Sequence, residues 1–466
     1  MFAFTLALDG DSKTPLYEQI YAYIKNEIRN GKIECRSKLP SARALAEYLQ
    51  ISRSTVDMAY AQLVSEGYIE SVPCKGYYVC EISLLYDIAP QKHNDILYAK
   101  EDKKENLIDF TPNGIDLEYF PFNTWRKITK SVLNVDNKEM FGNGDSMGDM
   151  ELRSSICSYL FEARNVHCSP EQILIGAGNY YLTTLLCRIF DDDKVIAMES
   201  PTYQRAYNIF RTNGRKVVTV KVDGDGINME MLKSCKADVV YVMPSHHYPL
   251  GTVMPISKRV ELLKWANESE GRYIIEDDYD SEFRYHGKPV PALKGISENN
   301  NIIYIGTFSK SIAPGLRISY MVLPEKLLEI YRRKLKFCSQ TVSRIEQATV
   351  REFIEGGYFE RHLNRMRAVY REKHDMIIAA FKENSDVIRI SGENAGLHLL
   401  LEVNNGMTED ELIAAAGKNG VRVYGLSENF NSGAEIYRSG IILGFAIVNK
   451  EQIEEGIKRL KEAWLK

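Results

Sequence analysis

Six short apolar runs, separated by helix-like stretches, constrain the fold more than any other feature of this chain. They lie at residues 173–175, 195–198, 217–220, 239–242, 273–275 and 302–305. Strands that alternate with helices in this way predict an α/β layered domain with a mostly parallel sheet. Ligands of such sheets bind at the carboxyl ends of the strands, so the residues after each run are the candidates for a functional site.

Length and composition limit the other possibilities. With 466 residues the chain is too long for one simple core, so two or more domains are expected. Its eight cysteines include no Cys-x-x-Cys pair, which argues against a structural zinc site and a disulfide scaffold and predicts reduced thiols in the cytoplasm. No segment resembles a signal peptide, and no apolar run is long enough to span a bilayer.

The run at 302–305 leads into Gly306-Thr307-Phe308-Ser309-Lys310, and Arg317 follows further on. A partly buried lysine has a lowered pKa and becomes a nucleophile, which suits a Schiff base with a carbonyl cofactor. Ser309, Thr307 and Arg317 can hold a phosphate beside it. The alternative is a surface lysine, and it would be preferred if no second group of polar residues followed the other runs.

Such a second group exists. Asp277 follows the run at 273–275 and can form a salt bridge with a protonated heterocyclic nitrogen, while Tyr279 can hydrogen-bond a phenolate oxygen. Gly178 and Asn179 form a turn before a helix, where backbone N–H groups can bind a phosphate. The alternatives are a solvated acidic loop and an ordinary turn. The distance along the chain to the lysine loop, one strand–helix unit, favours a shared site.

Tyr203 and Arg205 follow the run at 195–198. Tyr203 can stack on an aromatic cofactor, although a core tyrosine is the alternative, and Arg205 can bind an anionic ligand. The adjacent His246 and His247 have no matching third ligand, so no metal site is predicted.

The first eighty residues follow a different pattern. One helix is predicted up to Asn30-Gly31, and Ser41 and Ser52 are the expected N-caps of a second and a third. Two β-like runs at 68–71 and 77–79 then predict a hairpin, so the pattern is typical of a winged helix-turn-helix. The alternative is a small helical interaction domain with the same pattern.

The polar helix ends and the wing of this domain supply candidate DNA contacts, which are Ser41, Arg43, Arg53, Thr55 and Gly76. Residues 13–80 hold nine Lys/Arg and seven Asp/Glu, a net charge of +2, whereas the rest of the chain carries −6. This difference has the sign that a DNA-binding domain needs.

These residues resemble the GntR-type DNA-binding domain, through Pro15-Leu16-Tyr17, 39–46, 52–56, 59–63, 66–69 and 76–79. The resemblance implies that Arg43 and Arg53 touch double-stranded operator DNA, with Ser41 and Thr55 on phosphates. The predicted domains are therefore a winged-helix domain at 1–80, a linker at 81–106 and a larger domain at 107–466. The last part, about 331–466, is expected to form a smaller α+β subdomain.

The larger domain resembles fold-type I, aspartate-aminotransferase-like proteins that bind pyridoxal phosphate, and the full chain resembles the MocR branch of GntR-type regulators. The motifs that carry this are 148–153, 199–203, 244–246, 249–251, 277–285, 306–310, 314–317 and 443–445. By this resemblance Lys310 forms the Schiff base, Asp277 pairs with the pyridine nitrogen, Tyr279 binds the phenolate oxygen and Tyr203 stacks on the ring. The phosphate is implied to be held by Gly178, Asn179, Ser309 and Arg317. A head-to-tail homodimer is also implied.

One departure from the family pattern bears on activity. Aminotransferases of this fold bind the α-carboxylate of the amino acid with an arginine, and Ile442 stands at that place here. An apolar side chain cannot pair with a carboxylate. Arg438 or Arg205 can substitute, or the ligand is not an ordinary amino acid. Little or no turnover is expected.

The sequence thus predicts a transcription regulator that senses an amine, an amino acid or pyridoxal phosphate itself. Two alternatives remain at this point. One is an active aminotransferase with an appended winged-helix domain, and the other is a pyridoxal phosphate sensor that controls vitamin B6 synthesis.

Overall fold

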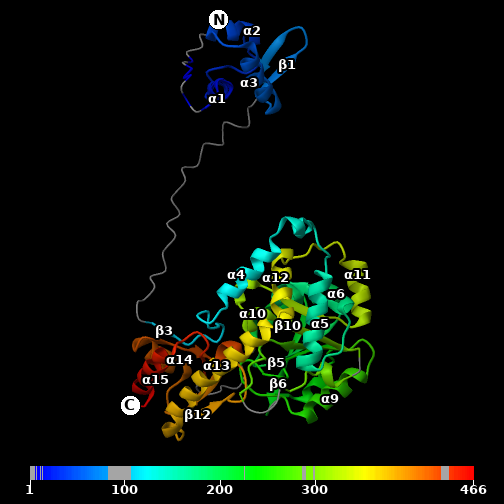
Figure 1. Cartoon of the computed structure of the whole chain (residues 1–466), viewed down its shortest axis with the longest axis vertical. Helices are drawn as coiled ribbons and strands as arrows, with labels where there is room; N and C mark the ends of the chain where they lie inside the picture. Colours follow the sequence, from blue (N-terminus) through cyan, green and yellow to red (C-terminus); the bar gives the residue numbers. More distant parts are fainter. Residues whose placement is uncertain are drawn as a thin grey trace. The chain divides into compact units, whose positions relative to one another are not determined.

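The structure is a computed structural model that describes residues 6, 8–10, 12, 14–81, 107–224, 226–285, 290–297, 300–431 and 440–465. The chain forms two compact units, Met1–Lys103 and Lys104–Lys466, and each is described by itself (Figure 1). The predicted linker at 81–106 falls outside the described residues except for Glu81.

The first unit consists of three helices and a two-stranded antiparallel sheet, namely α1 (Leu16–Arg29), α2 (Ala42–Leu49), α3 (Arg53–Ser65), β1 (Ile69–Val72) and β2 (Gly76–Val79). The side chain of Ser41 accepts a hydrogen bond from the N–H of Ala44 at 3.2 Å, and that of Ser52 accepts one from Thr55 at 3.3 Å. Both predicted N-caps are therefore in place, and they fix where α2 and α3 begin. The predicted arrangement of three helices and a hairpin is confirmed.

The second unit is built on an eight-stranded sheet of order β4-β11-β10-β9-β8-β5-β6-β7. Its strands are β4 (Ile173–Gly176), β5 (Val195–Ser200), β6 (Lys216–Asp223), β7 (Gly226–Ile227), β8 (Val239–Val242), β9 (Tyr273–Asp278), β10 (Ile302–Thr307) and β11 (Ser319–Val322). The pairs from β10 to β6 are parallel, whereas β11 is antiparallel to both of its neighbours. The mostly parallel sheet predicted from the six apolar runs is confirmed.

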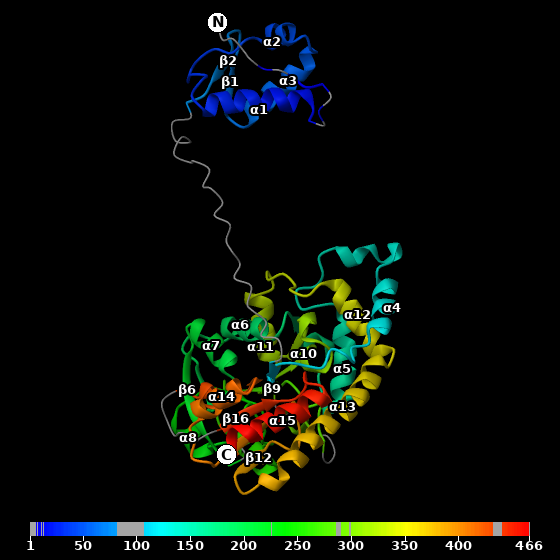
Figure 2. The same ribbon diagram turned by 90° about the vertical axis from the view of Figure 1, so that its left-hand side faces the viewer.

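Helices cover both faces of this sheet. One face packs on α6 (Asn179–Ile189), α7 (Gln204–Thr212) and α11 (Glu325–Lys334), and part of the other packs on α8 (Met229–Ser234) and α9 (Ile256–Asn267). Figure 2 shows α6 and α7 on one side of β6 and α8 on the other. Neighbouring strand residues alternate between the two faces, as Ile196 and Ala197 do. Because both faces are buried, the central strands carry continuous apolar runs, whereas the more exposed β6 contains Thr219 and Lys221.

The C-terminal part carries an antiparallel sheet of order β12-β13-β16-β15, formed by β12 (Ile388–Ser391), β13 (His398–Val403), β16 (Gly440–Gly444) and β15 (Tyr424–Gly425). A parallel pair joins β3 (Ile108–Asp109) to β14 (Val421–Arg422). The remaining α-helices are α4 (Phe122–Val132), α5 (Met150–Arg164), α10 (Phe308–Ser311), α12 (Arg344–Glu355), α13 (Tyr358–Phe381), α14 (Glu409–Lys418) and α15 (Lys450–Trp464). None of the helices in the described ranges is long and apolar enough to cross a membrane.

Candidate functional site

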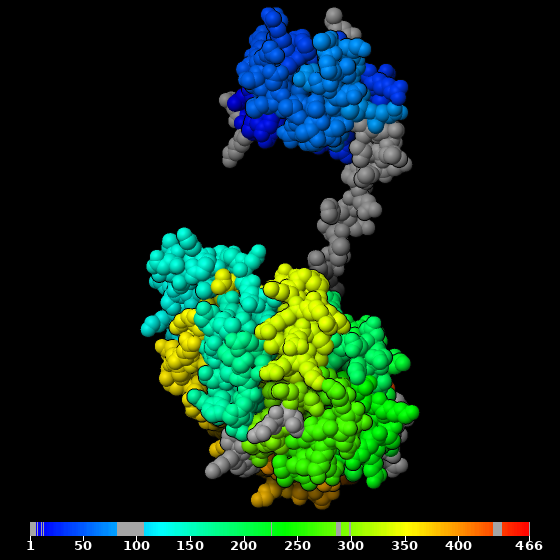
Figure 3. Space-filling model, turned by 90° about the vertical axis from the view of Figure 1, so that its right-hand side faces the viewer, coloured from blue at the N-terminus to red at the C-terminus, as the bar shows by residue number. Residues whose placement is uncertain are grey.

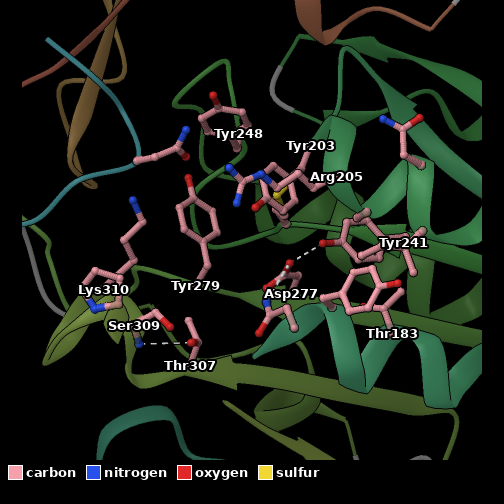
Figure 4. Close-up of a pocket in the computed structure, with 18 of the residues that line it drawn as sticks. Thr183, Tyr203, Arg205, Tyr241, Tyr248, Asp277, Tyr279, Thr307, Ser309 and Lys310 are labelled. Atoms are coloured by element: carbon pink, nitrogen blue, oxygen red, sulfur yellow. Dashed lines mark hydrogen bonds between the residues drawn. The ribbon is translucent and has the colours of Figure 1, made fainter. Parts of the chain in front are cut away.

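A cavity of about 450 Å³ lies where the parallel strands of the large sheet end (Figure 4). Seven of the eight predicted cofactor residues line it, which are Asn179, Tyr203, Asp277, Tyr279, Ser309, Lys310 and Arg317. Arg205, predicted as an effector contact, lines it as well. These side chains come from segments after β4, β5 and β10 and from the end of β9, so the sheet brings together residues that are far apart in the sequence.

Lys310 lies in the short helix α10, directly after β10. Its Nζ donates a hydrogen bond to the carbonyl oxygen of Pro112 at 3.0 Å. Burial lowers the pKa of this ammonium from its ordinary 10.5 to about 8; the Asp280 carboxylate opposes that shift and the positive charge of Arg205 adds to it. A lysine with such a pKa is partly unprotonated near neutral pH and can attack a carbonyl group.

Asp277 is 3% exposed and lies inside β9, which extends beyond the predicted run at 273–275. The hydroxyl of Tyr241 donates a hydrogen bond to its Oδ2, and the Asn179 Nδ2 donates one to Oδ1 at 3.3 Å. Burial raises the pKa of this carboxyl to about 7, and the hydrogen bond from Tyr241 opposes the rise. A buried carboxylate with this pKa gains stability from a positively charged partner, such as a protonated ring nitrogen.

Sequence reasoning missed Tyr241, because it is part of the apolar run at 239–242 and looks like a core residue. The available signal was its hydroxyl group, since a buried tyrosine needs a hydrogen-bond partner. Asn179 was predicted to hold a phosphate, and in the structure its side chain points to Asp277. Its backbone remains at the first turn of α6.

The turn before α6 and the loop after β10 meet at one end of the cavity. Gly178 is the N-cap of α6 and has φ +86°, a conformation that side chains rarely adopt. A Cβ atom at this glycine would lie 2.4 Å from Nη2 of Arg317, so the backbone and the guanidinium group approach as closely as they do only because residue 178 is glycine. The N–H of Ser309 donates to Oγ1 of Thr307 at 3.1 Å. Helix N-terminus, guanidinium and hydroxyl groups together form a typical anion-binding set.

The residues fit pyridoxal phosphate on three observations. The anion-binding set and the buried acid Asp277 share one cavity, Lys310 lines the same cavity, and Tyr203 contributes an aromatic face. Tyr203 is held edge-on by Tyr248, with ring centroids 5.7 Å apart. The hydroxyl of Tyr279 lies 2.9 Å from Nδ1 of His246, which also contacts Asp280 at 2.8 Å.

Ile442, which stands at the place of the usual carboxylate arginine, and Arg438, the other predicted effector residue, differ in outcome. Ile442 is 1% exposed and packs in an apolar cluster with Leu250, Leu400 and Leu426. Its own side chain therefore offers no charge to a carboxylate. Arg438 lies outside the described residues.

The predicted DNA contacts lie in the first unit. Ser41, Arg43 and Arg53 are exposed at the N-terminal ends of α2 and α3, and Thr55 accepts or donates a hydrogen bond with Ser52 at 2.7 Å. Arg53 has a weak ion pair with Asp57 at 3.3 Å between two exposed side chains, so it is free to exchange this partner for a phosphate. Gly76, with φ +109°, begins the second strand of the wing.

Comparison with known proteins agrees with this architecture. Residues 105–460 match the family described as "Aminotransferase class I and II", and residues 16–79 match "Bacterial regulatory proteins, gntR family". Fold and site together define a DNA-binding regulator with an aminotransferase-like domain. More particularly, the chain belongs to the aminotransferase class I and II family, in the branch of MocR-type HTH transcriptional regulators.

Relatives match this chain over nearly their whole length. The "Uncharacterized HTH-type transcriptional regulator YdeL" of Bacillus subtilis is 44% identical over 97% of both chains. The "Probable rhizopine catabolism regulatory protein MocR" of Rhizobium meliloti is 32% identical over 99% of this chain and 96% of its own. Among solved structures, an archaeal alanine:glyoxylate aminotransferase superposes with a TM-score of 0.70 at 26% identity, covering 78% of this chain and 92% of its own. Enzymes of this fold class use pyridoxal phosphate.

Proposed function

We propose that this protein is a transcription regulator that binds pyridoxal phosphate through Lys310 and changes its binding to DNA when a small molecule occupies the same cavity. The observation that carries the proposal is the convergence of Lys310, Asp277 and Arg317 on one cavity in a chain that also has a winged-helix unit. When bound, the cofactor supplies an aldehyde that forms an imine with an amine and a ring that withdraws electrons.

Each residue then has a defined task. Lys310 supplies the unprotonated amine, Asp277 holds a proton on the ring nitrogen and Tyr241 orients Asp277. Arg317, Ser309 and the N-terminus of α6 bind the phosphate. Tyr203 covers one face of the ring and excludes water, and Tyr279 hydrogen-bonds the phenolate oxygen.

The effector is either an amine or amino acid, or pyridoxal phosphate itself. Arg205 lines the cavity and supports an anionic group on the effector. The apolar surroundings of Ile442 support a ligand whose α-carboxylate is not bound by an arginine at residue 442, as it is in an aminotransferase. They therefore also support little turnover. A sensor of pyridoxal phosphate is the second candidate, supported by the same observation. A relative in Corynebacterium glutamicum, 26% identical, is named for the regulation of pyridoxine biosynthesis. The resemblance to MocR-type regulators also supports a head-to-tail homodimer.

The first experiment is the visible absorbance spectrum of the purified full-length protein with pyridoxal phosphate, before and after a panel of amines and amino acids. An imine band that one panel member shifts identifies an amine effector, and a band that none shifts favours pyridoxal phosphate as the effector. Absence of any band would contradict the proposal. Release of keto acid with an amino donor would instead favour the aminotransferase.

The DNA-binding half needs its own test. DNA fragments selected by the full-length protein in vitro supply the operator, and the affinity of Arg53→Ala is then compared with that of Lys32→Ala, an exposed lysine outside the helix N-termini. Loss of a base-edge contact by Arg53→Ala is expected to weaken binding by about 1–3 kcal/mol. Equal affinities would remove Arg53 from the interface.

A further inference from the structure

Two cysteines that the cofactor site does not use lie beside each other in the large unit. Cys157 belongs to α5, and Cys168 lies in the segment between α5 and β4. Their sulfur atoms are 3.8 Å apart, and both side chains are partly exposed. The turquoise segment that includes α5 lies on the surface in Figure 3. The pair is thus reachable from solvent.

The two thiols open into a surface hollow of about 340 Å³. Phe161 and His167 also line it, with their rings edge to face and 5.0 Å apart. A hollow with an apolar ring at its side and two adjacent thiols admits a small molecule to the sulfur atoms.

We propose that Cys157 and Cys168 form a thiol–disulfide exchange site, which reacts with a low-molecular-weight disulfide and closes a reversible disulfide within the chain. A disulfide bond is about 2 Å long, so the sulfur atoms must approach by a little under about 2 Å, which rotation of two partly exposed side chains can supply. The residues are eleven positions apart, and sequence spacing therefore gives no sign of the pair. Disulfides of this kind in reducing compartments are transient rather than structural.

The hydrogen bonds set the order of reaction. The thiol of Cys168 donates to the sulfur of Cys157, and the Cys157 thiol donates to the carbonyl oxygen of Cys168 at 3.0 Å. Within the pair, the sulfur of Cys157 is thus the acceptor and Cys168 is the donor. Burial, and next the neighbouring Cys157, raise the pKa of the Cys168 thiol to about 12. Cys157 is therefore the attacking thiolate, and Cys168 is the thiol that resolves the mixed disulfide.

The exchange balances in two steps. The Cys157 thiolate attacks one sulfur of the small disulfide, its S–S bond breaks, and the first small thiolate leaves. Cys168 then loses its proton and attacks the sulfur of Cys157, which expels the second small thiolate. Two protein thiols are oxidised, one small disulfide is reduced to two thiols, and the two protons of the cysteines go to the two leaving groups.

The disulfide would close a loop of the chain from Cys157 to Cys168, and the position of this loop links the reaction to the cofactor site. The segment between the two cysteines contains Arg164, which is 4% exposed. Its Nε donates to Oδ2 of Asp278 at 2.8 Å, and its Nη2 donates to Oγ of Ser245 at 2.6 Å. Asp278 is the neighbour of Asp277. Oxidation therefore restrains a segment whose buried arginine holds the end of β9.

The test treats the reduced full-length protein with 2-hydroxyethyl disulfide and follows intact mass, with tryptic mapping after acid quenching. We expect loss of two hydrogens and a cross-link between the peptides 154–164 and 165–188, which reverses with dithiothreitol. The matched control Cys235→Ser, which alters another partly exposed cysteine, is expected to form the same cross-link. Stable adducts on both Cys157 and Cys168 without a cross-link would overturn the proposal.

Single variants test the order of attack. In Cys168→Ser the first step has no resolving thiol, so the probe is expected to remain on Cys157. In Cys157→Ser, Cys168 is expected to react at least about tenfold more slowly than Cys157 does in Cys168→Ser, because a thiol with a raised pKa holds little thiolate. If either serine variant fails to fold, Cys157→Ala and Cys168→Ala replace the serine variants in the same measurement. Equal rates at the two cysteines, or no adduct on Cys157, would contradict the assigned roles.

Discussion

The floor of the cavity, formed by Asp277, Lys310 and their hydrogen-bond partners, and the apolar cluster around Ile442 belong to the same unit but differ in charge and polarity. The floor, at the ends of the large sheet, holds the buried Asp277 and the half-buried Lys310, both with perturbed pKa values and hydrogen-bond partners. The cluster joins Leu250 of the large sheet's loops to Leu400, Leu426 and Ile442 of the C-terminal part, and Val222, Tyr424 and Phe430 pack against it. One region is arranged to hold charge, and the other excludes it.

Under the proposed function, this difference means that the chain keeps charged groups for a cofactor but has an apolar residue where aminotransferases bind the α-carboxylate of the substrate. Burying a carboxyl group or an ammonium costs free energy, so such residues persist where a partner compensates for the burial. The floor keeps such residues, whereas the cluster has the composition of an ordinary core. A protein that held an amino acid by its α-carboxylate would need the opposite at residue 442. The predictions below test the two regions separately.

The largest effect is expected for Lys310→Ala. Without the ε-amine no imine can form, so the visible band of the protein with pyridoxal phosphate should disappear completely. Absorbance spectroscopy at saturating cofactor measures this. The exposed Lys326→Ala, which pairs only with Glu270 among the contacts described, should keep the band. A band of unchanged intensity in Lys310→Ala would place the nucleophile elsewhere.

Ile442→Arg tests the cluster. An arginine here would bury a charge among leucines with no partner, and we expect the free energy of unfolding to fall by about 3–5 kcal/mol, measured by urea denaturation. Ile442→Val, which removes one methylene, should cost only about 1 kcal/mol. We expect no gain of transaminase activity in the arginine variant. A stable Ile442→Arg protein that turns over amino acids would show that the cluster is a carboxylate site lacking only its arginine.

Much of this contrast was readable in the sequence, for physical reasons. Strands buried on both faces carry continuous apolar runs, so Asp277 and Lys310 could be found by pattern as residues that follow such runs, although β9 itself continues to Asp278. The helices capped by Ser41 and Ser52 were located by local chemistry. Tyr241 and the Cys157–Cys168 pair were not, because they depend on which side chains meet across the fold. Such contacts have no signature at fixed spacing.

The reactivity of Lys310 should follow its lowered pKa. Because only the unprotonated amine attacks a carbonyl, the rate of imine formation should rise with pH and level off above about 8, whereas an ordinary lysine continues to gain reactivity toward 10.5. Stopped-flow absorbance measures the rate of imine formation by the protein. Dividing this rate by the rate of imine formation by free Nα-acetyl-lysine at the same pH removes the effect of the cofactor's own titration. A ratio that stays constant with pH would mean that burial does not perturb this lysine.

Asp277→Asn should weaken the binding of pyridoxal phosphate. Asparagine keeps the shape but loses the charge that pairs with the ring nitrogen, and a hydrogen bond to a charged group contributes about 1.5–3 kcal/mol. The expected loss of affinity is about 10–100-fold, measured by cofactor titration. Asp223→Asn, an exposed residue at the end of β6, is the control and should not change affinity. An unchanged affinity in Asp277→Asn would separate this carboxylate from the cofactor.

Tyr241→Phe should have the smallest effect and carries the most information about how the floor works. Phenylalanine removes only the hydroxyl that donates to Asp277, so the carboxylate loses one hydrogen bond, about 1 kcal/mol, and cofactor affinity should fall about fivefold. If the role of Tyr241 is to orient Asp277, the double variant with Asp277→Asn should lose little beyond Asp277→Asn alone. Fully additive losses would mean that Tyr241 acts on its own, for example by packing. Since Tyr241 lies within an apolar strand of the sheet, coupling between the two residues would show that the core of the fold, and not only its loops, sets the charge of the site.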